Sequence, residues 1–307
     1  MGKVIIVGSL TMDVTAFASP LPKPGETVLG TRFETIPGGK GANQAVAAAR
    51  AGAQTVIIGC IGTDVFGDMV WANLETEGIS TDGVSRVDDR TGVAHIRVDA
   101  AGQNDIVVVP LANGHLTPEL ADEQLRAVAQ AGDVLLVQLE VPFPTVERAI
   151  ATGKELGMRV ILDPAPAPAA DALTAEVWDG LFAVTPNEFE AAAITGADTD
   201  TREGLGQAAA AFTAMGVQNV LLTLGERGSY LDGELYAAAK VQVIDTTAAG
   251  DVFAGYLGAA VADGEPLSEA LRTAMAAGSI AVTRVGASAS VPYRDEVLAA
   301  LQGDITG

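Results

Sequence analysis

Cysteine, histidine and aromatic residues are scarce in this chain of 307 residues. Its one cysteine, Cys60, cannot form an internal disulfide, so we expect a reducing compartment, the cytoplasm. The two histidines have no neighbours at metal-ligand spacing, which argues against a zinc site. No apolar run approaches the roughly 20 residues that span a bilayer. The first run, at 4–7, leads into a glycine turn and is too short for a signal sequence.

Basic residues are also few: 18 lysines and arginines stand against 39 aspartates and glutamates, for a formal net charge of -21. A surface this acidic repels phosphate backbones and anionic lipids. We therefore expect neither nucleic acid nor a membrane as a partner. A ligand that carries phosphate would need a local device, such as a helix N-terminus or a metal ion.

Short β-branched apolar runs alternate along the chain with longer alanine-rich amphipathic segments. The runs predict strands at 4–7, 55–60, 134–138, 159–162, 181–185 and 220–224. The longer segments predict helices at 41–51, 67–77, 118–130, 144–156, 188–195 and 204–215, followed by 252–262 and 267–284. This alternation predicts an α/β fold: a doubly wound, mostly parallel sheet with helices on both faces.

Two segments, about 14–36 and 91–110, interrupt the alternation. The first is punctuated by proline and glycine, and the second consists of two β runs joined by a turn at 100–104. Together they predict a small β-sheet lid over the carboxyl ends of the parallel strands, or alternatively two ordinary surface hairpins. The chain has no internal repeat or linker, so residues 1–307 are expected to form a single domain.

The strongest chemical motif is Asp245-Thr-Thr-Ala-Ala-Gly-Asp251, which leads into a helix. A small-residue turn at a helix N-terminus leaves backbone N–H groups free to bind an anion. Asp251 would then lie beside a bound phosphate, where it could take a proton from an attacking hydroxyl. Simple helix capping explains the same aspartate, so this motif alone leaves both interpretations open.

A second motif, Gly38-Gly-Lys-Gly-Ala-Asn-Gln44, opens the first helix, and its lysine and asparagine offer donors to an oxygen-rich ligand. It lacks the spacing of a Walker A loop. The turn after the first strand lacks the glycines of a dinucleotide fingerprint, which disfavours a NAD enzyme. Asp13 follows the first strand and could accept hydrogen bonds from sugar hydroxyls, although a lone aspartate there is commonly a turn residue. Glu140, just after another strand, is by itself an ordinary strand-end carboxylate.

Two further motifs follow predicted strands. In Thr185-Pro-Asn-Glu-Phe-Glu190, Asn187 suits a helix N-cap, and the glutamates could organise Mg²⁺ through water. Leu222-Thr-Leu-Gly-Glu-Arg-Gly228 is a glycine-punctuated turn that could pass beneath a nucleotide.

Taken in order, these motifs resemble the signatures of the ribokinase family of carbohydrate kinases, and the resemblance runs across essentially the whole chain. It implies a Rossmann-like α/β domain with a β-sheet lid, and a homodimer formed through the lids. It also implies phosphorylation of D-ribose to D-ribose 5-phosphate by ATP with Mg²⁺. In that reaction Asp251 would be the general base, and Ala249 and Gly250 would form the anion hole.

The resemblance also assigns binding residues. Sugar-contacting positions are Thr11, Asp13, Gly39, Lys40, Asn43, Glu140 and Asp251. Nucleotide-contacting positions are Asn187, Thr223, Gly225, Gly228, Ala249 and Gly250. A monovalent cation, usually K⁺, would be held by Asp245, Thr247, Ala281, Arg284, Gly286 and Ser290. Arg284 would contribute only its carbonyl oxygen, and its guanidinium would have to point away.

The chain departs from the family pattern at Thr11, where ribokinases usually carry an asparagine that helps to recognise ribose hydroxyls. A threonine offers one hydroxyl rather than the two ends of an amide. Three functions therefore remain open. The first is a ribokinase, the second is a kinase of 2-deoxyribose, another sugar or a nucleoside, and the third is a catalytically silent sugar-binding protein.

Overall fold

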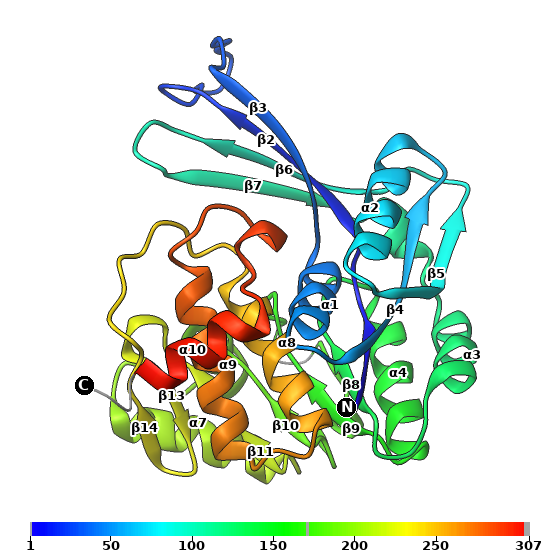
Figure 1. Ribbon diagram of the computed structural model, residues 1–307, viewed down its shortest axis with the longest axis vertical. Helices are drawn as coiled ribbons and strands as arrows, with labels where there is room; N and C mark the ends of the chain where they lie inside the picture. The colour runs from blue at the N-terminus through cyan, green and yellow to red at the C-terminus, as the bar shows by residue number, and fades with distance from the viewer. Residues whose placement is uncertain (1, 170–171, 304–307) are drawn as a thin grey trace.

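The computed structural model describes residues 2–169 and 172–303, and it is built around one seven-stranded parallel sheet (Figure 1). The strands lie in the order β11-β10-β9-β8-β1-β4-β5. Their bounds are β1 Lys3–Val7, β4 Gln54–Gly62, β5 Ser80–Val87, β8 Val134–Val137, β9 Arg159–Leu162, β10 Ala183–Val184 and β11 Asn219–Val220. The predicted doubly wound parallel sheet is confirmed.

Both faces of this sheet are buried beneath helices, which explains the continuous apolar runs of its strands. In β1, Val4 and Ile6 pack in one hydrophobic cluster, whereas Ile5 and Val7 pack in a second cluster on the opposite face. The first cluster includes residues of α1 (Lys40–Arg50), α2 (Val65–Thr76), α8 (Ala249–Ala262), α9 (Leu267–Ala281) and α10 (Arg294–Gly303). The second includes residues of α3 (Pro118–Val128), α4 (Phe143–Glu155), α5 (Ala175–Trp178), α6 (Glu188–Thr195) and α7 (Arg202–Ala214).

The structure corrects two strand predictions. The predicted strand at 220–224 is divided: Val220 ends β11, while β12 (Leu222–Thr223) pairs with β13 (Ser229–Leu231) in a separate sheet completed by β14 (Glu234–Tyr236). The apolar run indicated burial, but burial alone does not reveal which strand is the partner. The edge strand β5 was not predicted, because its partly exposed sequence STDGVSRV contains no continuous apolar run.

The small sheet predicted from the two interrupting segments is present and projects from the main body (Figure 1). Its strand order is β3-β2-β6-β7, with bounds β2 Thr11–Phe17, β3 Arg32–Gly38, β6 Gly92–Val98 and β7 Asn104–Val109. Strand β2 follows β1 closely, and β3 leads directly into α1. The small sheet is therefore rooted at the carboxyl end of the central strand β1.

Strand β1 lies between β4 and β8, and the chain order reverses at the junction of β1 and β8. In open α/β sheets a ligand crevice forms outside the carboxyl ends of the strands at such a reversal. A ligand crevice is therefore expected where β1 and β8 end, beside the root of the small sheet. Among the residues that the structure describes, no helix has the length and apolarity needed to cross a membrane.

Helices α1 and α8 pack closely against each other because α8 presents a glycine at their crossing. A Cβ atom added to Gly255 would lie 2.5 Å from Ala47 Cβ and 2.6 Å from the carbonyl oxygen of Gln44. Any side chain at this position would force the helices apart. The close approach matters for the site, since it brings the start of α1 to the start of α8.

Candidate active site

Polar side chains gather at the carboxyl ends of neighbouring parallel strands. Ser9 follows β1, Glu140 lies beyond β8, and Asp163 follows β9. The Ser9 hydroxyl donates a hydrogen bond to Glu140 Oε2 at 2.5 Å, and the backbone N–H of Lys40 donates to the same oxygen at 3.0 Å. Glu140 thus ties the first turn of α1 to the ends of the two strands at the sheet's reversal.

Asp251 lies in the first turn of α8 and is 4% exposed. Its carboxylate receives hydrogen bonds from two side chains of α1: Asn43 Nδ2 lies 3.0 Å from Oδ2, and Gln44 Nε2 lies 3.3 Å from Oδ1. The ammonium of Lys40 lies 3.8 Å from Oδ1. Three residues of the GGKGANQ motif therefore converge on the aspartate of the DTTAAGD motif.

The start of α8 is shaped to receive an anion. Its N-cap, Ala248, has a left-handed backbone (φ 59°), and its side chain cannot accept a hydrogen bond from the first turn. Ala249, Gly250 and Asp251 line a pocket of about 190 Å³, which also borders on Lys40. Backbone N–H groups and one lysine are thus the positive features of a pocket whose other charged groups are acidic.

Burial and mutual charge perturb the ionisable groups of this pocket. The charge of Asp251 holds the pKa of the Lys40 ammonium above its ordinary value. Burial raises the pKa of Asp163 well above the range of an aspartate, and burial also raises the pKa of Glu190. Lys40 therefore stays charged, while protonation of Asp163 is favoured. Such perturbed groups in one pocket are typical of a functional site.

Asp13, on β2 at the root of the small sheet, is the other predicted sugar ligand with a perturbed pKa. Burial, together with the charges of Glu140 and Asp251, raises it to about 6, against an opposing hydrogen bond from Thr11. The Thr11 hydroxyl lies 3.3 Å from Asp13 Oδ1. Above that pH the carboxylate is ionised and can accept hydrogen bonds from hydroxyl groups.

Four of the six predicted nucleotide-binding residues line the pocket, namely Asn187, Thr223, Ala249 and Gly250, whereas Gly225 and Gly228 do not. Asn187 caps α6, and its side chain and that of Glu190 form a reciprocal capping box. Asn187 also bridges to Thr223 on β12, and both residues line the pocket. Of the two glutamates proposed to organise Mg²⁺, Glu190 lines the pocket, whereas Glu188 forms an ion pair with Arg227. Gly225 and Gly228 begin and end the turn that follows β12, where the N–H of Gly228 donates to the carbonyl of Gly225 at 3.1 Å.

The predicted cation-binding residues come from two segments that meet beside α8. The Asp245 carboxylate accepts from the N–H of Thr247 and the N–H of Gly286, each at 2.9 Å. Burial opposes ionisation of Asp245, but a hydrogen bond from the Thr247 hydroxyl at 2.6 Å, together with these two, outweighs burial and lowers the pKa of Asp245. The guanidinium of Arg284 pairs with Glu296. The two segments offer a carboxylate, backbone carbonyls and the Ser290 hydroxyl, an all-oxygen donor set that suits a hard cation.

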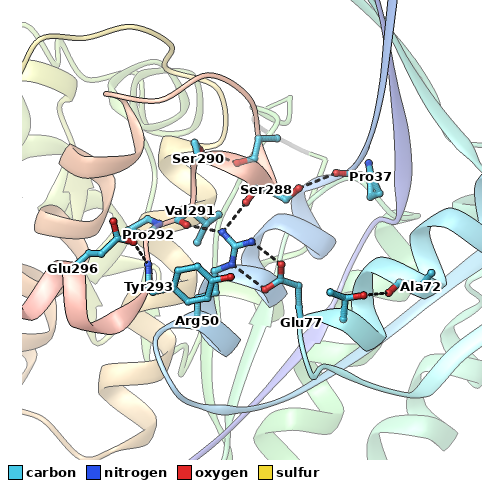
Figure 2. Close-up of polar contacts among 12 residues, drawn as sticks. Pro37, Arg50, Ala72, Glu77, Ser288, Ser290, Val291, Pro292, Tyr293 and Glu296 are labelled. Carbon is cyan, nitrogen blue, oxygen red and sulfur yellow. Dashed lines mark hydrogen bonds and ion pairs between the residues drawn. The ribbon is translucent and has the colours of Figure 1, made fainter.

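Arg50, at the end of α1, holds the second of these segments in place (Figure 2). Its Nη1 donates to the carbonyls of Ser288 and Val291 at 3.1 and 2.6 Å. Its other nitrogens form a two-pronged pair with Glu77, at 2.9 and 2.6 Å. The Ser288 hydroxyl in turn donates to the carbonyl of Pro37 on β3 at 3.3 Å, as Figure 2 shows. One guanidinium thus links α1, the segment at 288–291 and, through that segment, the small sheet.

Four residues that now belong to the site were not predicted: Ser9, Gln44, Gln138 and Asp163. Asp163 directly follows β9, so the strand-end argument that selected Asp13 could have found it. Gln44 lies within the GGKGANQ motif but was not assigned a role. The strand-end argument also applies to Gln138, which directly follows β8 but was placed inside the predicted strand at 134–138. Ser9 carried no distinguishing signal in the sequence.

The fold and the site together define a class of protein. A buried carboxylate in the first turn of a helix whose start lines a pocket, beside a second sheet, is suited to phosphoryl transfer onto a small hydroxyl-bearing acceptor. The model of the pfkB family carbohydrate kinases matches residues 1–294. The chain belongs to this family.

Known proteins are similar to this chain over nearly its whole length. A ribokinase of Haemophilus influenzae is 38% identical over 302 residues, which cover 97% of each chain. A deoxyribokinase of Salmonella typhi is 34% identical, covering 94% of this chain and 95% of its own. The structure of Arabidopsis thaliana ribokinase complexed with ribose and ATP aligns with a TM-score of 0.87 at 32% identity, covering 98% of this chain and 99% of that one.

Proposed function

We propose that this carbohydrate kinase transfers the γ-phosphoryl group of ATP to the 5-hydroxyl of D-ribose, yielding D-ribose 5-phosphate and ADP. The observation that carries the proposal is the position of Asp251. It is buried at the helix start that lines the anion pocket, and it is close enough to Asp13 to raise the pKa of that residue. A base between a sugar-binding carboxylate and a phosphate pocket has both reactants within reach.

In this reaction the sugar hydroxyl loses its proton to Asp251 as its oxygen forms a bond to the γ-phosphorus. The bond from that phosphorus to the β–γ bridging oxygen breaks, and ADP leaves. The N–H groups of Ala249 and Gly250, with the Lys40 ammonium, would stabilise the charge on the transferring group, and the Ala249 N–H would exchange its 3.3 Å hydrogen bond to the Thr246 carbonyl for the phosphoryl oxygen. Asp13, Gly39, Asn43 and Glu140 would position the sugar, and Asn187 with the turn from Thr223 to Gly228 would position the nucleotide.

A second acceptor, 2-deoxyribose, is favoured by one observation. The one O–H donor of Thr11 is engaged with Asp13, and the residue is buried, so Thr11 has no donor left for an additional sugar hydroxyl. A deoxyribokinase among the similar proteins is consistent with this alternative.

An assay of ADP release tests the function and separates these acceptors. With Mg²⁺-ATP and K⁺, kcat/KM is compared for D-ribose, 2-deoxy-D-ribose, D-fructose and adenosine, in the wild type and in Thr11→Asn. We expect D-ribose to be preferred and Thr11→Asn to increase its advantage over 2-deoxyribose. A preference for another acceptor would keep the kinase mechanism and change the assigned substrate. No turnover with any acceptor would refute the kinase and favour a silent sugar-binding protein.

We further propose that the reaction uses Mg²⁺ with ATP and proceeds in the cytoplasm. Among residues 2–169 and 172–303, no three histidine, cysteine or acidic side chains form a metal-binding group. A magnesium ion would then be held chiefly by the nucleotide phosphates, water and one pocket carboxylate such as Glu190, which is its common mode of binding. The buried, unpaired thiol of Cys60 is consistent with a reducing compartment.

A monovalent cation, K⁺, is proposed to bind between the two segments that Asp245 links, where it would order the start of α8. Its proposed ligands are Asp245, Thr247, Ala281, Arg284, Gly286 and Ser290. We expect the rate to increase strongly with K⁺ and much less with Na⁺ at constant ionic strength. Equal rates in the two salts would contradict a selective site.

We also propose a homodimer formed through the small sheet. Four consecutive apolar residues of its edge strand, from Ile106 to Val109, are each at least 43% exposed. An exposed apolar edge strand is a surface that a second chain can cover. Sedimentation should show a dimer that Val107→Asp with Val109→Asp dissociates, whereas the control Val65→Asp, at another exposed valine, leaves it intact. A monomeric wild type would refute this assembly.

A further inference from the structure

Two glutamines lie buried behind the proposed base and have no part in the roles assigned above. Gln44 is on α1, and Gln138 follows the last residue of β8. Both are 0% exposed. A fully buried amide side chain must satisfy its polar groups within the protein, so its partners define how it can be oriented.

Gln44 connects two carboxylates to Gln138. Its Nε2 donates to Asp163 Oδ2 at 2.8 Å and to Asp251 Oδ1 at 3.3 Å. Its Oε1 accepts a hydrogen bond of 2.5 Å from Gln138 Nε2. Both N–H groups of the Gln44 amide are thereby directed at the carboxyl groups, and its oxygen is directed away from them.

This orientation follows from hydrogen-bond chemistry. An ionised carboxylate only accepts hydrogen bonds, so a Gln44 oxygen facing Asp251 would be repelled. Gln138 stabilises the productive orientation by donating to that oxygen from behind. The Gln138 side chain is confined by packing against Gly8, where an added Cβ atom would lie 2.1 Å from its Oε1, and this oxygen accepts no hydrogen bond from the residues that the structure describes. The second glutamine therefore fixes the first.

We propose that Gln44 and Gln138 are positioning residues for phosphoryl transfer: Gln44 orients Asp251 and stabilises its ionised form, and Gln138 acts through Gln44. The inference rests on the proposed role of Asp251 as general base.

The charges around Asp251 explain why a neutral donor is useful there. Lys40 faces it from α1, Asp163 from the end of β9, Glu190 from α6 and Asp13 from β2. One cation thus stands among several carboxyl groups, which together oppose a further negative charge. Gln44 supplies a hydrogen bond to the ionised base without adding charge. The second N–H of Gln44 donates to Asp163, whose own burial favours its protonated form.

The test replaces each glutamine with methionine, which has a similar volume but no donor. We expect Gln44→Met to lower kcat about 10-fold or more, as for loss of a hydrogen bond to a charged group. The acid limb of the kcat–pH profile should move to higher pH, because the carboxylate loses a hydrogen bond that favours its ionised form. ADP affinity should stay unchanged. Gln138→Met should show the same changes to a smaller degree, and the double variant should be no worse than Gln44→Met.

Thr145→Val is the matched control, since Thr145, on α4, is equally buried, donates to the carbonyl of Leu116 and does not line the pocket. It should lose stability without moving the acid limb. If both glutamine variants bind ADP normally and keep the wild-type acid limb, the positioning role is refuted. Asp251→Asn separates the two hypotheses. High turnover in Asp251→Asn refutes Asp251 as the general base. Low turnover in Asp251→Asn, together with a wild-type acid limb in Gln44→Met, refutes only the positioning role of the glutamines.

Discussion

Asp251→Asn is expected to reduce kcat by about 10²–10⁴-fold, the usual contribution of a general base. The amide cannot take the proton from the attacking hydroxyl, while the shape of the pocket is kept. Both Asn43 and Gln44 donate to this carboxylate, so one of them would face the new NH₂ group. Asp251→Ala removes that conflict and should lose as much turnover. ADP release measures the rate, and calorimetry with D-ribose and ADP verifies that binding persists.

An exposed aspartate provides the control for this substitution. Asp82, on the edge strand β5, is exposed, so Asp82→Asn should turn over at the wild-type rate. If Asp251→Asn and Asp251→Ala both retained near-normal kcat, the proton would have another acceptor, and the mechanism proposed for this pocket would be wrong.

The largest expected effect on stability comes from Arg50→Met. The side chains of Arg50 and Glu77 are each 12% exposed, so removing the guanidinium leaves a nearly buried carboxylate unpaired. The carbonyls of Ser288 and Val291 also lose their donor. Breaking a buried pair from one side costs about 3 kcal/mol or more of unfolding free energy. Urea unfolding followed by circular dichroism measures the loss.

Two further variants separate the buried pair from a general effect of removing charge. Arg50→Met with Glu77→Met should be more stable than Arg50→Met alone, since no unpaired carboxylate remains. Arg97→Met removes a similar two-pronged pair with Asp105 that is exposed on the small sheet, and its unfolding midpoint should hardly move. If Arg50→Met and the double variant lost the same free energy of unfolding, leaving Glu77 unpaired would not destabilise the protein.

Local sequence was sufficient wherever a structural signal is carried by neighbouring residues. The apolar runs of β1, β4, β8 and β9 are continuous because both faces of the sheet are buried, so their strands and the parallel architecture could be predicted. The two β-rich interruptions likewise predicted the small sheet. The same signal failed between Val220 and Leu222, which are both buried but pair with strands of different sheets. An apolar run indicates burial but carries no information on the partner strand.

The family resemblance named most residues of the site, because its motifs are contiguous stretches such as GGKGANQ and DTTAAGD. Their convergence could not be derived from local pattern, since Asn43 and Asp251 are separated by 208 positions and meet only where α1 crosses α8. That crossing depends on Gly255, whose role is apparent only once the facing helix is known.

The sequence by itself thus determined the class of fold, the motifs and the family of kinases they resemble, since each is encoded in short contiguous patterns of burial and turn chemistry. Only the tertiary structure decided which side chains surround Asp251. It placed Gln44, Gln138 and Asp163 in one buried hydrogen-bonded group and Arg50 at the junction of three elements. The physical reason is that hydrogen bonds and charge act through space, between residues that chain packing brings together from distant positions.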